Sequence, residues 1–330
     1  MATIKQTLHW GIIGANPSAA LWCEALQSLT DTQVLAVASK DKSAASTFAR
    51  RFGLKHSYND AQQLTDDARI DAILVATPAS THATFSMMAM RAGKPVCVLP
   101  PLTRTYEDCL RLNRVSQETN LPCFVAFYRR TLPIINKVKE LIEHNVVGNL
   151  LNIQTNVMAP VSSNLASSNA TNIRKLGLEP DNNDMFSLVA PQQLDIIQEI
   201  FGVIVKAHGY ENVLPNTGSQ DRSIAACLRF SSGQVGSASW SFCQSATDLN
   251  DFVEVFGTDG NLKFSVYDEK PIILQTPHRE EIIDVDCLAN PYQLFLQQMS
   301  DHIRGLNHCS SDSISATSVC WLMDRILWKV

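Results

Sequence analysis

The sequence lacks three features that mark large classes of proteins. No apolar run reaches the roughly 18 residues that a membrane-spanning helix needs, so we expect no membrane partner. No block of about five or six like charges occurs, and the net charge is −5, so nucleic acid is not expected as a partner either. The N-terminal residues lack the basic start and uninterrupted apolar stretch of a signal peptide, and we therefore expect a cytoplasmic protein.

The cysteines are numerous, but their spacing matches neither a disulfide framework nor a metal site. There are nine, none in a C-x-x-C pair, and most lie inside apolar runs, as Cys97 and Cys123 do. In a chain without a signal peptide this pattern predicts reduced thiols in the core. His308 and Cys309 are adjacent, and adjacent residues rarely bind one ion, so the sequence predicts no metal site.

Short apolar strands alternate with helices through the first third of the 330-residue chain. Helices are expected to begin near Pro17 and to end near Gly53 and Gly93, because proline is tolerated at a helix start and glycine at a helix end. This alternation predicts an α/β domain with a parallel, doubly wound sheet, which we place at residues 1–126. The predicted strands are residues 8–13, 34–38, 70–76, 96–99 and 123–127.

From residue 127 onward the pattern changes to short strands of alternating polarity. Gly233 and Gly260 mark hairpin turns between such strands. Residues 127–330 are therefore predicted to form an α+β domain with a large, mostly antiparallel open sheet. The predicted strands are residues 150–158, 224–230, 235–242, 252–256, 261–266, 272–275 and 282–285, and the predicted helices are residues 132–144, 185–201, 292–304 and 315–327.

The segment G-I-I-G-A-N-P-S-A joins the first strand to the first helix. Dinucleotide folds place glycines here so that the backbone approaches a pyrophosphate at a helix N-terminus. Gly14 is present, and Ala19 fits the third, packing position, but Asn16 stands where the second glycine belongs. Asparagine tolerates a positive φ, although its side chain would crowd a phosphate. The motif alone is weak, because strand–glycine–helix turns also occur without ligands.

The order of several motifs is more specific. After the glycine segment come D-A-I-L-V-A-T-P-A-S-T-H, A-G-K-P-V-C-V-L-P-P-L-T, F-S-S-G-Q-V-G-S-A and V-F-G-T-D-G-N-L-K-F, at consistent spacing. Over nearly its whole length the chain resembles the family of glucose–fructose oxidoreductase, inositol dehydrogenase and rhizopine-catabolism proteins (Gfo/Idh/MocA). The resemblance implies a Rossmann nucleotide-binding domain, a second domain with an open sheet, and NAD or NADP as cofactor. It also implies a homodimer or homotetramer that assembles through the C-terminal sheet.

Three positions depart from the family pattern together. Members usually carry E-K-P after the fourth strand, with the lysine moving the hydroxyl proton, whereas this chain has Leu99 and Pro100. Members also carry an Asp and, four residues later, a His on one helix face; here these positions hold Leu188 and Gln192. Acid–base catalysis is worth roughly a hundred- to ten-thousandfold per group. We therefore name no catalytic residue and do not expect ordinary sugar-alcohol oxidation.

The predicted cofactor site keeps several family features. Besides Gly14 and Asn16 it includes Ser39-Lys40, which stands where an acidic residue usually grips the NAD ribose. This change favours NADP, although Lys40 is also consistent with a solvated loop charge. Thr77, Pro78 and His82 match the family stretch along the nicotinamide, and a packed helix N-terminal histidine is the alternative for His82.

Polar residues of the second domain are candidates for a ligand cleft. Arg129 and Arg130 follow the fifth strand, where the family often has an arginine near cofactor and substrate; an interdomain salt bridge is the alternative. Asp195 either contacts a polar ligand or holds its helix in place. The predicted cleft residues are Arg129, Arg130, Arg174, Gln192 and Asp195.

Two functions fit this sequence. The first is an NAD(P)-dependent oxidoreductase-family protein with non-standard chemistry on an unidentified small-molecule ligand, as in the family's biliverdin reductases, which also lack the lysine. The second is a non-catalytic sensor or regulatory partner on the same fold, similar to the family's galactose-pathway repressor. The loss of three groups favours the sensor, and the retained A-T-P-A-S-T-H stretch favours the oxidoreductase.

Overall fold

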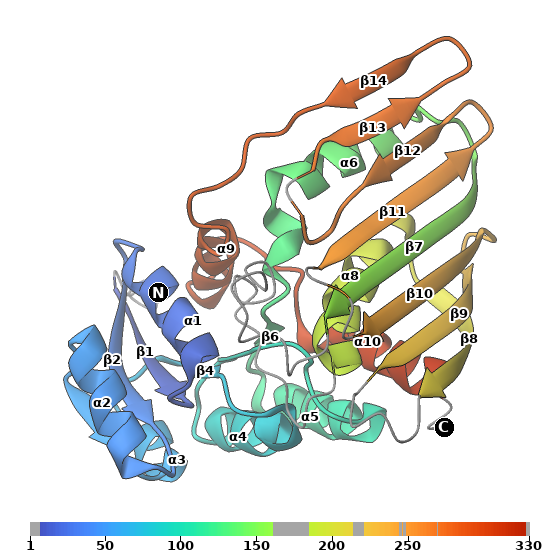
Figure 1. The fold of residues 1–330 in the computed structure, drawn as a ribbon. Helices are drawn as coiled ribbons and strands as arrows, with labels where there is room; N and C mark the ends of the chain where they lie inside the picture. The colour runs from blue at the N-terminus through green and yellow to red at the C-terminus, as the bar shows by residue number, and fades with distance from the viewer. Residues whose placement is uncertain are drawn as a thin grey trace. The chain divides into compact units, whose positions relative to one another are not determined.

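A computed structural model describes residues 7–160, 185–213, 221–243, 246, 249–268 and 270–327 (Figure 1). Contacts divide the chain into two compact units. The first unit is Met1–Tyr128 with Asn290–Cys320, and the second is Arg129–Ala289 with Trp321–Val330. The sequence placed all of residues 127–330 in one domain, whereas residues 290–320 group with the first unit; the linear domain boundary stays a prediction.

The first unit is built on a six-stranded sheet in the order β3-β2-β1-β4-β5-β6, with every neighbouring pair parallel. Its inner strands read as continuous apolar runs because a parallel sheet is covered on both faces. The strands are β1 (Leu8–Ile13), β2 (Thr32–Ala38), β3 (His56–Tyr58), β4 (Ala72–Val75), β5 (Val96–Val98) and β6 (Cys123–Val125). The helices are α1 (Pro17–Gln27), α2 (Lys42–Phe52), α3 (Ala61–Thr65), α4 (Ala79–Arg91), α5 (Tyr106–Thr119) and α9 (Gln293–Ile303).

Local capping explains where these helices begin and end. Asn16, Asp41 and Thr105 each accept a hydrogen bond from a first-turn amide of α1, α2 and α5 respectively. α2 ends at Gly53, whose φ of +64° is the left-handed conformation that glycine adopts without strain. The boundaries of these helices are thus set by short-range sequence signals.

The second unit is built on an eight-stranded sheet in the order β14-β13-β12-β11-β7-β10-β9-β8. All neighbours are antiparallel except β7 and β10. The strands are β7 (Leu150–Pro160), β8 (Ile204–Val213), β9 (Arg222–Phe230), β10 (Val235–Cys243), β11 (Asn250–Gly257), β12 (Asn261–Phe264), β13 (Ile272–Gln275) and β14 (Glu280–Ile283). The helical segments are η1 (Tyr128–Thr131, a 3-10 turn that starts one residue before this unit), α6 (Pro133–Glu143), α8 (Met185–Phe201) and the end of α10 (Ser313–Ile326).

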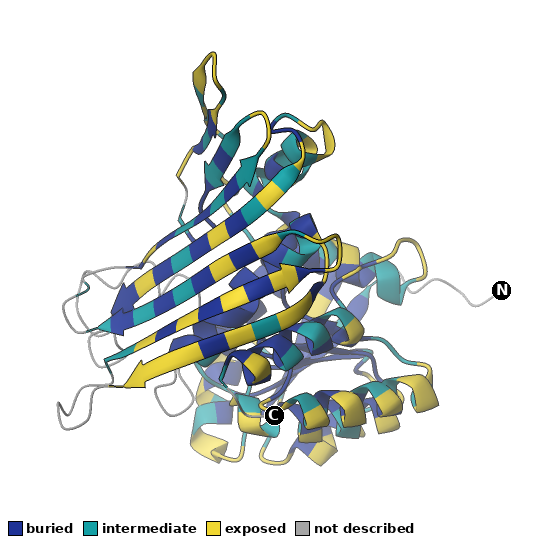
Figure 2. Cartoon of the chain, turned by 90° about the vertical axis from the view of Figure 1, so that its right-hand side faces the viewer, coloured by how far each residue is buried: buried dark blue, intermediate teal, exposed yellow. Residues whose placement is uncertain are grey.

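Burial alternates along the strands of this sheet (Figure 2). One face carries Ile224, Trp240 and Val253 into the core, and α8 contacts β10 on that side. The opposite face is open in the isolated chain, and Figure 2 looks onto it. A period of two with one apolar face is what an antiparallel sheet covered on a single side requires.

The predicted fold class is confirmed: a parallel doubly wound sheet followed by a mostly antiparallel open sheet. The prediction missed β3, α3, β8 and η1. β8 was missed because its exposed positions mix valine with lysine, histidine and asparagine, so no clean alternation shows. Within the described ranges, no helix has both the length and the apolarity to cross a membrane.

Candidate functional site

The predicted cofactor residues follow the central strands of the first sheet. In the order β3-β2-β1-β4-β5-β6, the connections that follow β1 and β4 lead in opposite directions along the sheet. Such a reversal leaves a crevice at the carboxyl ends of these two strands. Gly14 follows β1, Ser39 follows β2, Thr77 lies two residues after β4, and Leu99 follows β5. The predicted cofactor residues of the first unit therefore gather at one edge of its sheet.

Gly14 is fixed by both neighbouring strands. Its amide donates to the Ala38 carbonyl oxygen at 2.8 Å, and its φ is +116°. A Cβ at this position would lie 2.5 Å from the Ala76 carbonyl oxygen, which is shorter than any real contact. Only glycine fits here, because both the backbone conformation and the close approach to β4 exclude a side chain.

The φ of Asn16 is negative, so the tolerance of asparagine for a positive φ does not explain its place in this turn. Its φ is −123°, and its side chain caps α1 by accepting from the Ala19 amide at 2.8 Å. The same side chain donates through Nδ2 to the Ala76 carbonyl oxygen at 2.7 Å. Both ends of the amide are committed to protein atoms, so the turn is closed by Asn16 where a second glycine would leave it open. Pro17, the first residue of α1, has no N–H to offer a phosphate.

The carboxylate nearest the predicted ribose position, that of Asp41, is already hydrogen-bonded to protein atoms. Asp41 Oδ1 accepts from the Ser43 and Ala44 amides at 2.8 and 3.1 Å and so serves as the N-cap of α2. Ser39 Oγ accepts from the Asp41 amide at 3.2 Å. Lys40 is exposed and makes no ion pair within the described parts of the chain. The first two polar side chains after β2 are thus the hydroxyl of Ser39 and the ammonium group of Lys40.

His82 is 2% exposed and lies between two carbonyl oxygens. Its Nδ1 is 2.8 Å from the Pro101 oxygen, and its Nε2 is 2.6 Å from the Thr77 oxygen. A carbonyl oxygen only accepts, so the ring nitrogen that carries the proton donates to the oxygen that faces it. His82 joins the turn after β4 to the turn after β5; its contact with cofactor stays a prediction.

The segment after β5 is buried and without ionisable side chains. Leu99, Pro100, Pro101 and Leu102 are all buried, and the Pro100–Pro101 peptide bond is cis. The segment from Leu99 to Leu102 therefore carries no proton donor on its side chains. That Pro100 stands at the lysine position of the family stays a prediction.

In the second unit Arg130 organises a chain of four charges. Its Nε and Nη2 donate to the two Asp195 oxygens at 2.8 and 2.5 Å, and its Nη1 is 3.2 Å from Glu199. Lys139 Nζ reaches the other Glu199 oxygen at 2.6 Å. Burial raises the pKa of Asp195 to about 6, even though the guanidinium acts in the opposite direction. These contacts match the alternative that Asp195 holds its helix, α8, in place.

Arg129 points to a different part of the second unit. Its Nη1 donates to the Val266 carbonyl oxygen at 2.7 Å, and its guanidinium lies 4.8 Å from the centre of the Tyr267 ring. Asp251, which the sequence reading missed, accepts from Ser265 Oγ at 2.5 Å and from the Val266 amide at 2.7 Å. Burial raises the pKa of Asp251. Its position along the strand could have revealed Asp251 in the sequence, because it shares the inward face of β11 with Val253 and Val255.

Leu188 and Gln192 are one turn apart on α8, and both are buried. Gln192 is 2% exposed, and its Oε1 accepts no hydrogen bond from the described part of the chain. The next residue, Gln193, donates through Nε2 to Thr155 Oγ1 at 2.6 Å, but its Oε1 also accepts no hydrogen bond from the described residues. A buried carbonyl oxygen without a donor is costly, which marks Gln192 as a candidate ligand contact. Arg174 lies outside the described residues.

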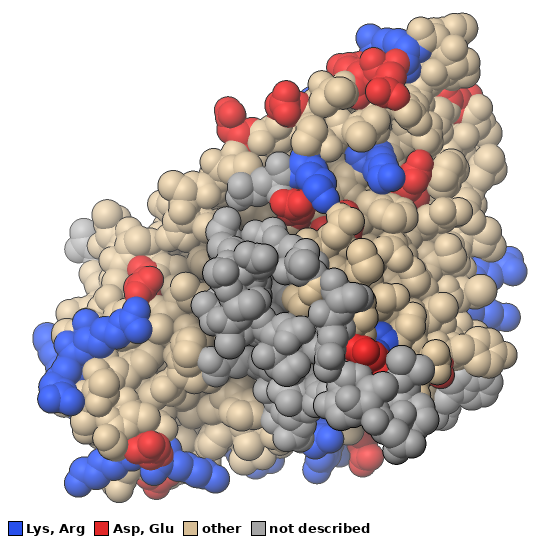
Figure 3. Space-filling model, viewed as in Figure 1, with Lys and Arg blue, Asp and Glu red and all other residues tan. Residues whose placement is uncertain are grey.

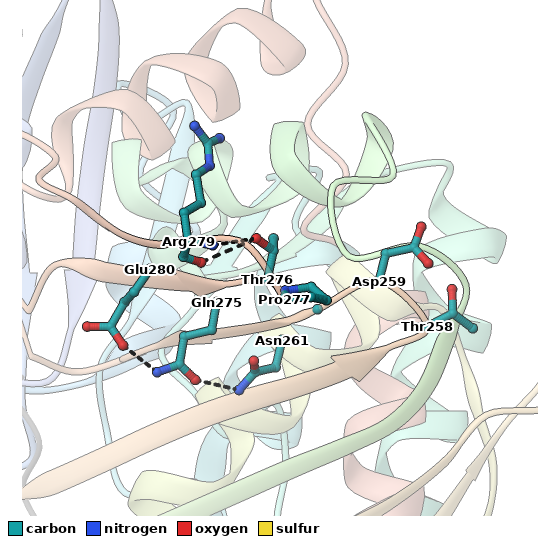
Figure 4. Close-up of a pocket in the computed structure, with 9 residues that line it drawn as sticks. Thr258, Asp259, Asn261, Gln275, Thr276, Pro277, Arg279 and Glu280 are labelled. Carbon is teal, nitrogen blue, oxygen red and sulfur yellow. Dashed lines mark hydrogen bonds between the residues drawn. The ribbon is translucent and has the colours of Figure 1, made fainter.

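A groove of about 460 Å³ lies elsewhere in the second unit, between the β11–β12 and β13–β14 turns (Figure 4). Its polar side chains bond one another: Gln275 Nε2 donates to Glu280 at 2.6 Å, and Asn261 Nδ2 donates to Gln275 at 3.1 Å. No predicted site residue lines it. It is therefore not the candidate site.

Comparison with known proteins agrees with the geometry of the first unit. Residues 8–127 match the oxidoreductase family with an NAD-binding Rossmann fold. Residues 8–127 therefore carry the NAD-binding domain of the Gfo/Idh/MocA oxidoreductase family. Oxidoreductase P35 of Formosa agariphila is 26% identical over 80% of this chain and 81% of its own length. Levoglucosan dehydrogenase of Pseudarthrobacter phenanthrenivorans is 24% identical over 69% of this chain and 64% of its own length.

Solved structures share the fold across both units of this chain. Levoglucosan dehydrogenase in complex with NADH and L-sorbose aligns with a TM-score of 0.81 at 18% identity, covering 98% of this chain and 96% of that one. Biliverdin reductase of Synechocystis sp. PCC 6803, in complex with biliverdin and NADP+, aligns with a TM-score of 0.79 at 18% identity, covering 97% and 98%. The predicted family and its NAD-binding fold are confirmed.

Proposed function

We propose that this chain binds NADP(H) in preference to NAD(H) and reduces a small conjugated carbonyl compound without a protein acid–base group. The proposal rests on the family resemblance, which aligns Pro100, Leu188 and Gln192 with the Lys, Asp and His of other members. All three replacements are buried and none is ionisable. The positive φ of Gly14 and the strand order of the first sheet, in contrast, support dinucleotide binding, although Asn16 closes part of the turn.

The chemistry follows from which groups remain. A bound reduced nicotinamide supplies a hydride to an electrophilic carbon of the acceptor, and the matching proton comes from water. A conjugated acceptor spreads the developing negative charge, so it depends less on a protein acid than an alcohol oxidation does. The biliverdin reductase that shares this fold, in complex with biliverdin and NADP+, supports such an acceptor class.

The first test is a titration of NADPH and NADH that follows intrinsic tryptophan fluorescence, followed by a screen of conjugated carbonyl compounds for loss of the reduced-nicotinamide absorbance. We expect saturable NADPH binding and turnover with at least one acceptor. Binding without turnover across the screen would favour the sensor function, which the loss of the three groups also supports. No binding of either nucleotide at millimolar concentration would contradict both functions.

Lys40→Ala tests the proposed preference for NADP(H). We expect the Kd of NADPH to rise about tenfold and that of NADH to change less than about twofold, because the lost cation would pair with the 2′-phosphate, which NADH lacks. A tenfold change is about 1.4 kcal/mol, the scale of one charge-assisted contact. The measurement is the same fluorescence titration. Lys55→Ala is the matched control, since Lys55 is an exposed lysine beyond the other end of α2. Equal weakening of both nucleotides by Lys40→Ala would refute the preference.

Gln192→Met tests whether the unpaired side-chain oxygen of Gln192 binds a ligand. Methionine keeps the length of the side chain but removes the buried, unpaired oxygen, so we expect the free energy of unfolding to rise by about 1 kcal/mol while acceptor turnover falls. Chemical denaturation and the absorbance assay measure the two effects. Gln193→Met is the comparison, because it removes an equally unpaired oxygen but also breaks the bond from Nε2 to Thr155, so it should be less stable than Gln192→Met. A stability loss with Gln192→Met would show that its side chain is held by the protein and not by a ligand.

A further inference from the structure

Two cysteines that lie far apart in the sequence meet inside the first unit, where side chains of α5 and α10 make contact. Cys109 lies in the first turn of α5, and Cys320 lies near the middle of α10. Cys109 is completely buried, and Cys320 is 6% exposed. The Cys320 thiol hydrogen-bonds to the Cys109 sulfur, and neither residue forms a disulfide. The two sulfur atoms are thus neighbours without a covalent bond between them.

A second contact holds the same two helices in register. Asn113, one turn after Cys109 on α5, donates through Nδ2 to Thr317 Oγ1 at 2.8 Å. Thr317 precedes Cys320 by about one turn on α10, so it lies on the same face of that helix. The helices therefore pass each other in opposite directions, with one polar contact and one thiol contact between them. The meeting of the two sulfurs is fixed by helix packing.

Thr103, which precedes α5, contacts both sulfur atoms. Its Oγ1 lies 2.9 Å from Cys109 Sγ, and its carbonyl oxygen accepts from Cys320 Sγ at 4.0 Å. The one hydroxyl proton of Thr103 can turn toward the Thr105 carbonyl oxygen, at 2.8 Å, or toward the Cys109 sulfur. A thiolate at Cys109 therefore has a hydroxyl donor beside it as well as the Cys320 thiol.

These contacts set Cys109 apart from other buried thiols of the same unit. Hydrogen bonds from Cys320 and Thr103 lower the pKa of Cys109, although it is buried. Burial raises the pKa of Cys23 to about 12 and raises that of Cys97 as well. Because the thiolate is the form that reacts with oxidants, Cys109 is more open to oxidation than Cys23 and Cys97.

We propose that Cys109 and Cys320 form a reversible disulfide when the protein meets hydrogen peroxide. The Cys109 thiolate attacks one peroxide oxygen, the O–O bond breaks, and a sulfenic acid and hydroxide result. The Cys320 thiol then attacks the oxidised sulfur, and the S–S bond forms as water leaves. Two electrons pass from the pair of sulfurs to the peroxide, and a dithiol reduces the bond again.

The oxidant has a short route to Cys109. Its neighbours in the first turn of α5, Asp108 and Leu110, are half-buried and exposed respectively. Figure 3 shows charged side chains at the lower margin of the view, where α4 and α5 lie. Opening of this single turn brings the sulfur to solvent. The disulfide ties α5 to Cys320, the residue at which α10 passes from the first unit into the second. This thiol chemistry is independent of the reaction proposed above.

Peptide mapping of the full-length protein tests the pair. The protein is treated with hydrogen peroxide, the remaining thiols are blocked, and a tryptic digest is analysed by mass spectrometry. We expect residues 105–111 linked to residues 305–325, lighter by two hydrogen atoms than the separate peptides together, and separated again by a dithiol. Because residues 305–325 contain Cys309 as well as Cys320, fragmentation of the linked peptide assigns the partner.

Three variants, each checked for folding by circular dichroism, complete the test. Cys227→Ser/Cys287→Ser removes two exposed thiols that could link separate chains, and it should form the bond as the wild type does, as should Cys309→Ser. Cys320→Ser should instead retain a sulfenic acid on Cys109 that dimedone traps. Absence of the linked peptide at a peroxide concentration that oxidises Cys227 and Cys287 would overturn the proposal. So would a link to Cys309, or Cys320→Ser without a dimedone adduct.

Discussion

Gly14→Ala is expected to lose more than about 3 kcal/mol of the free energy of unfolding and to abolish nucleotide binding. The new Cβ would lie 2.5 Å from the Ala76 carbonyl oxygen, and alanine does not adopt a φ of +116° without strain. β4 and the turn after β1 must then separate, and that separation also breaks the Asn16 bond to Ala76. Chemical denaturation and the NADPH titration measure the two losses.

Gly53→Ala is the matched control for strain without collision. Gly53 also has a positive φ, +64°, but a Cβ there meets no atom within 4 Å. Its cost should be about 1 kcal/mol, with nucleotide binding retained. If Gly14→Ala were as mild as Gly53→Ala, the close approach of β1 and β4 at the proposed cofactor site would be wrong.

Arg130→Ala is expected to destabilise the protein by about 3–5 kcal/mol at neutral pH, because it leaves the buried Asp195 without its counter-charge. Arg130→Met/Asp195→Leu should recover most of this loss, since it removes both charges. Urea denaturation gives the free energies. Lys139→Ala is the control; it removes a partly exposed cation of the same network and should cost about 1 kcal/mol or less.

The pH dependence of this variant has a definite sign. Asp195 already has a pKa raised to about 6 by burial, and removing Arg130 raises that pKa further. A raised folded pKa means that this group favours the folded state when protonated, so its contribution is fully present below the unfolded pKa of about 4 and is lost as pH rises. The cost of Arg130→Ala should therefore shrink between pH 7 and pH 4. A cost that is independent of pH would mean that Asp195 is not the group left uncompensated.

Much of the fold was readable because its signals are local. β1 and α8 have the predicted bounds, since a strand of continuous apolar residues and a 17-residue apolar helix leave little ambiguity. Gly53 ended α2 as predicted. β3 and α3 are only three and five residues long, too short to show a period, and they exist because β2 and β1 offer them surfaces to pack on.

The sequence predicts which positions belong to the candidate site, but not which of its residues contact one another. The sequence placed Asn16 in the nucleotide turn, yet its bond to Ala76 joins residues 60 apart, and no local pattern predicts such a pair. Arg130 and Asp195 were both named as cleft residues, but their pairing across 65 positions is a product of tertiary packing. The orphaned oxygen of Gln192 is visible only once the burial of α8 is known.

The claim that the family fold is kept while its alcohol chemistry is lost has one direct test. The wild-type protein is mixed with NADP+ and a panel of sugar alcohols, and in parallel with NADPH and conjugated carbonyl compounds, and the reduced-nicotinamide absorbance is followed in both. We predict no increase with any sugar alcohol and a decrease with at least one conjugated acceptor. Steady oxidation of a sugar alcohol would contradict the account, because it would require a proton acceptor that Pro100, Leu188 and Gln192 do not provide.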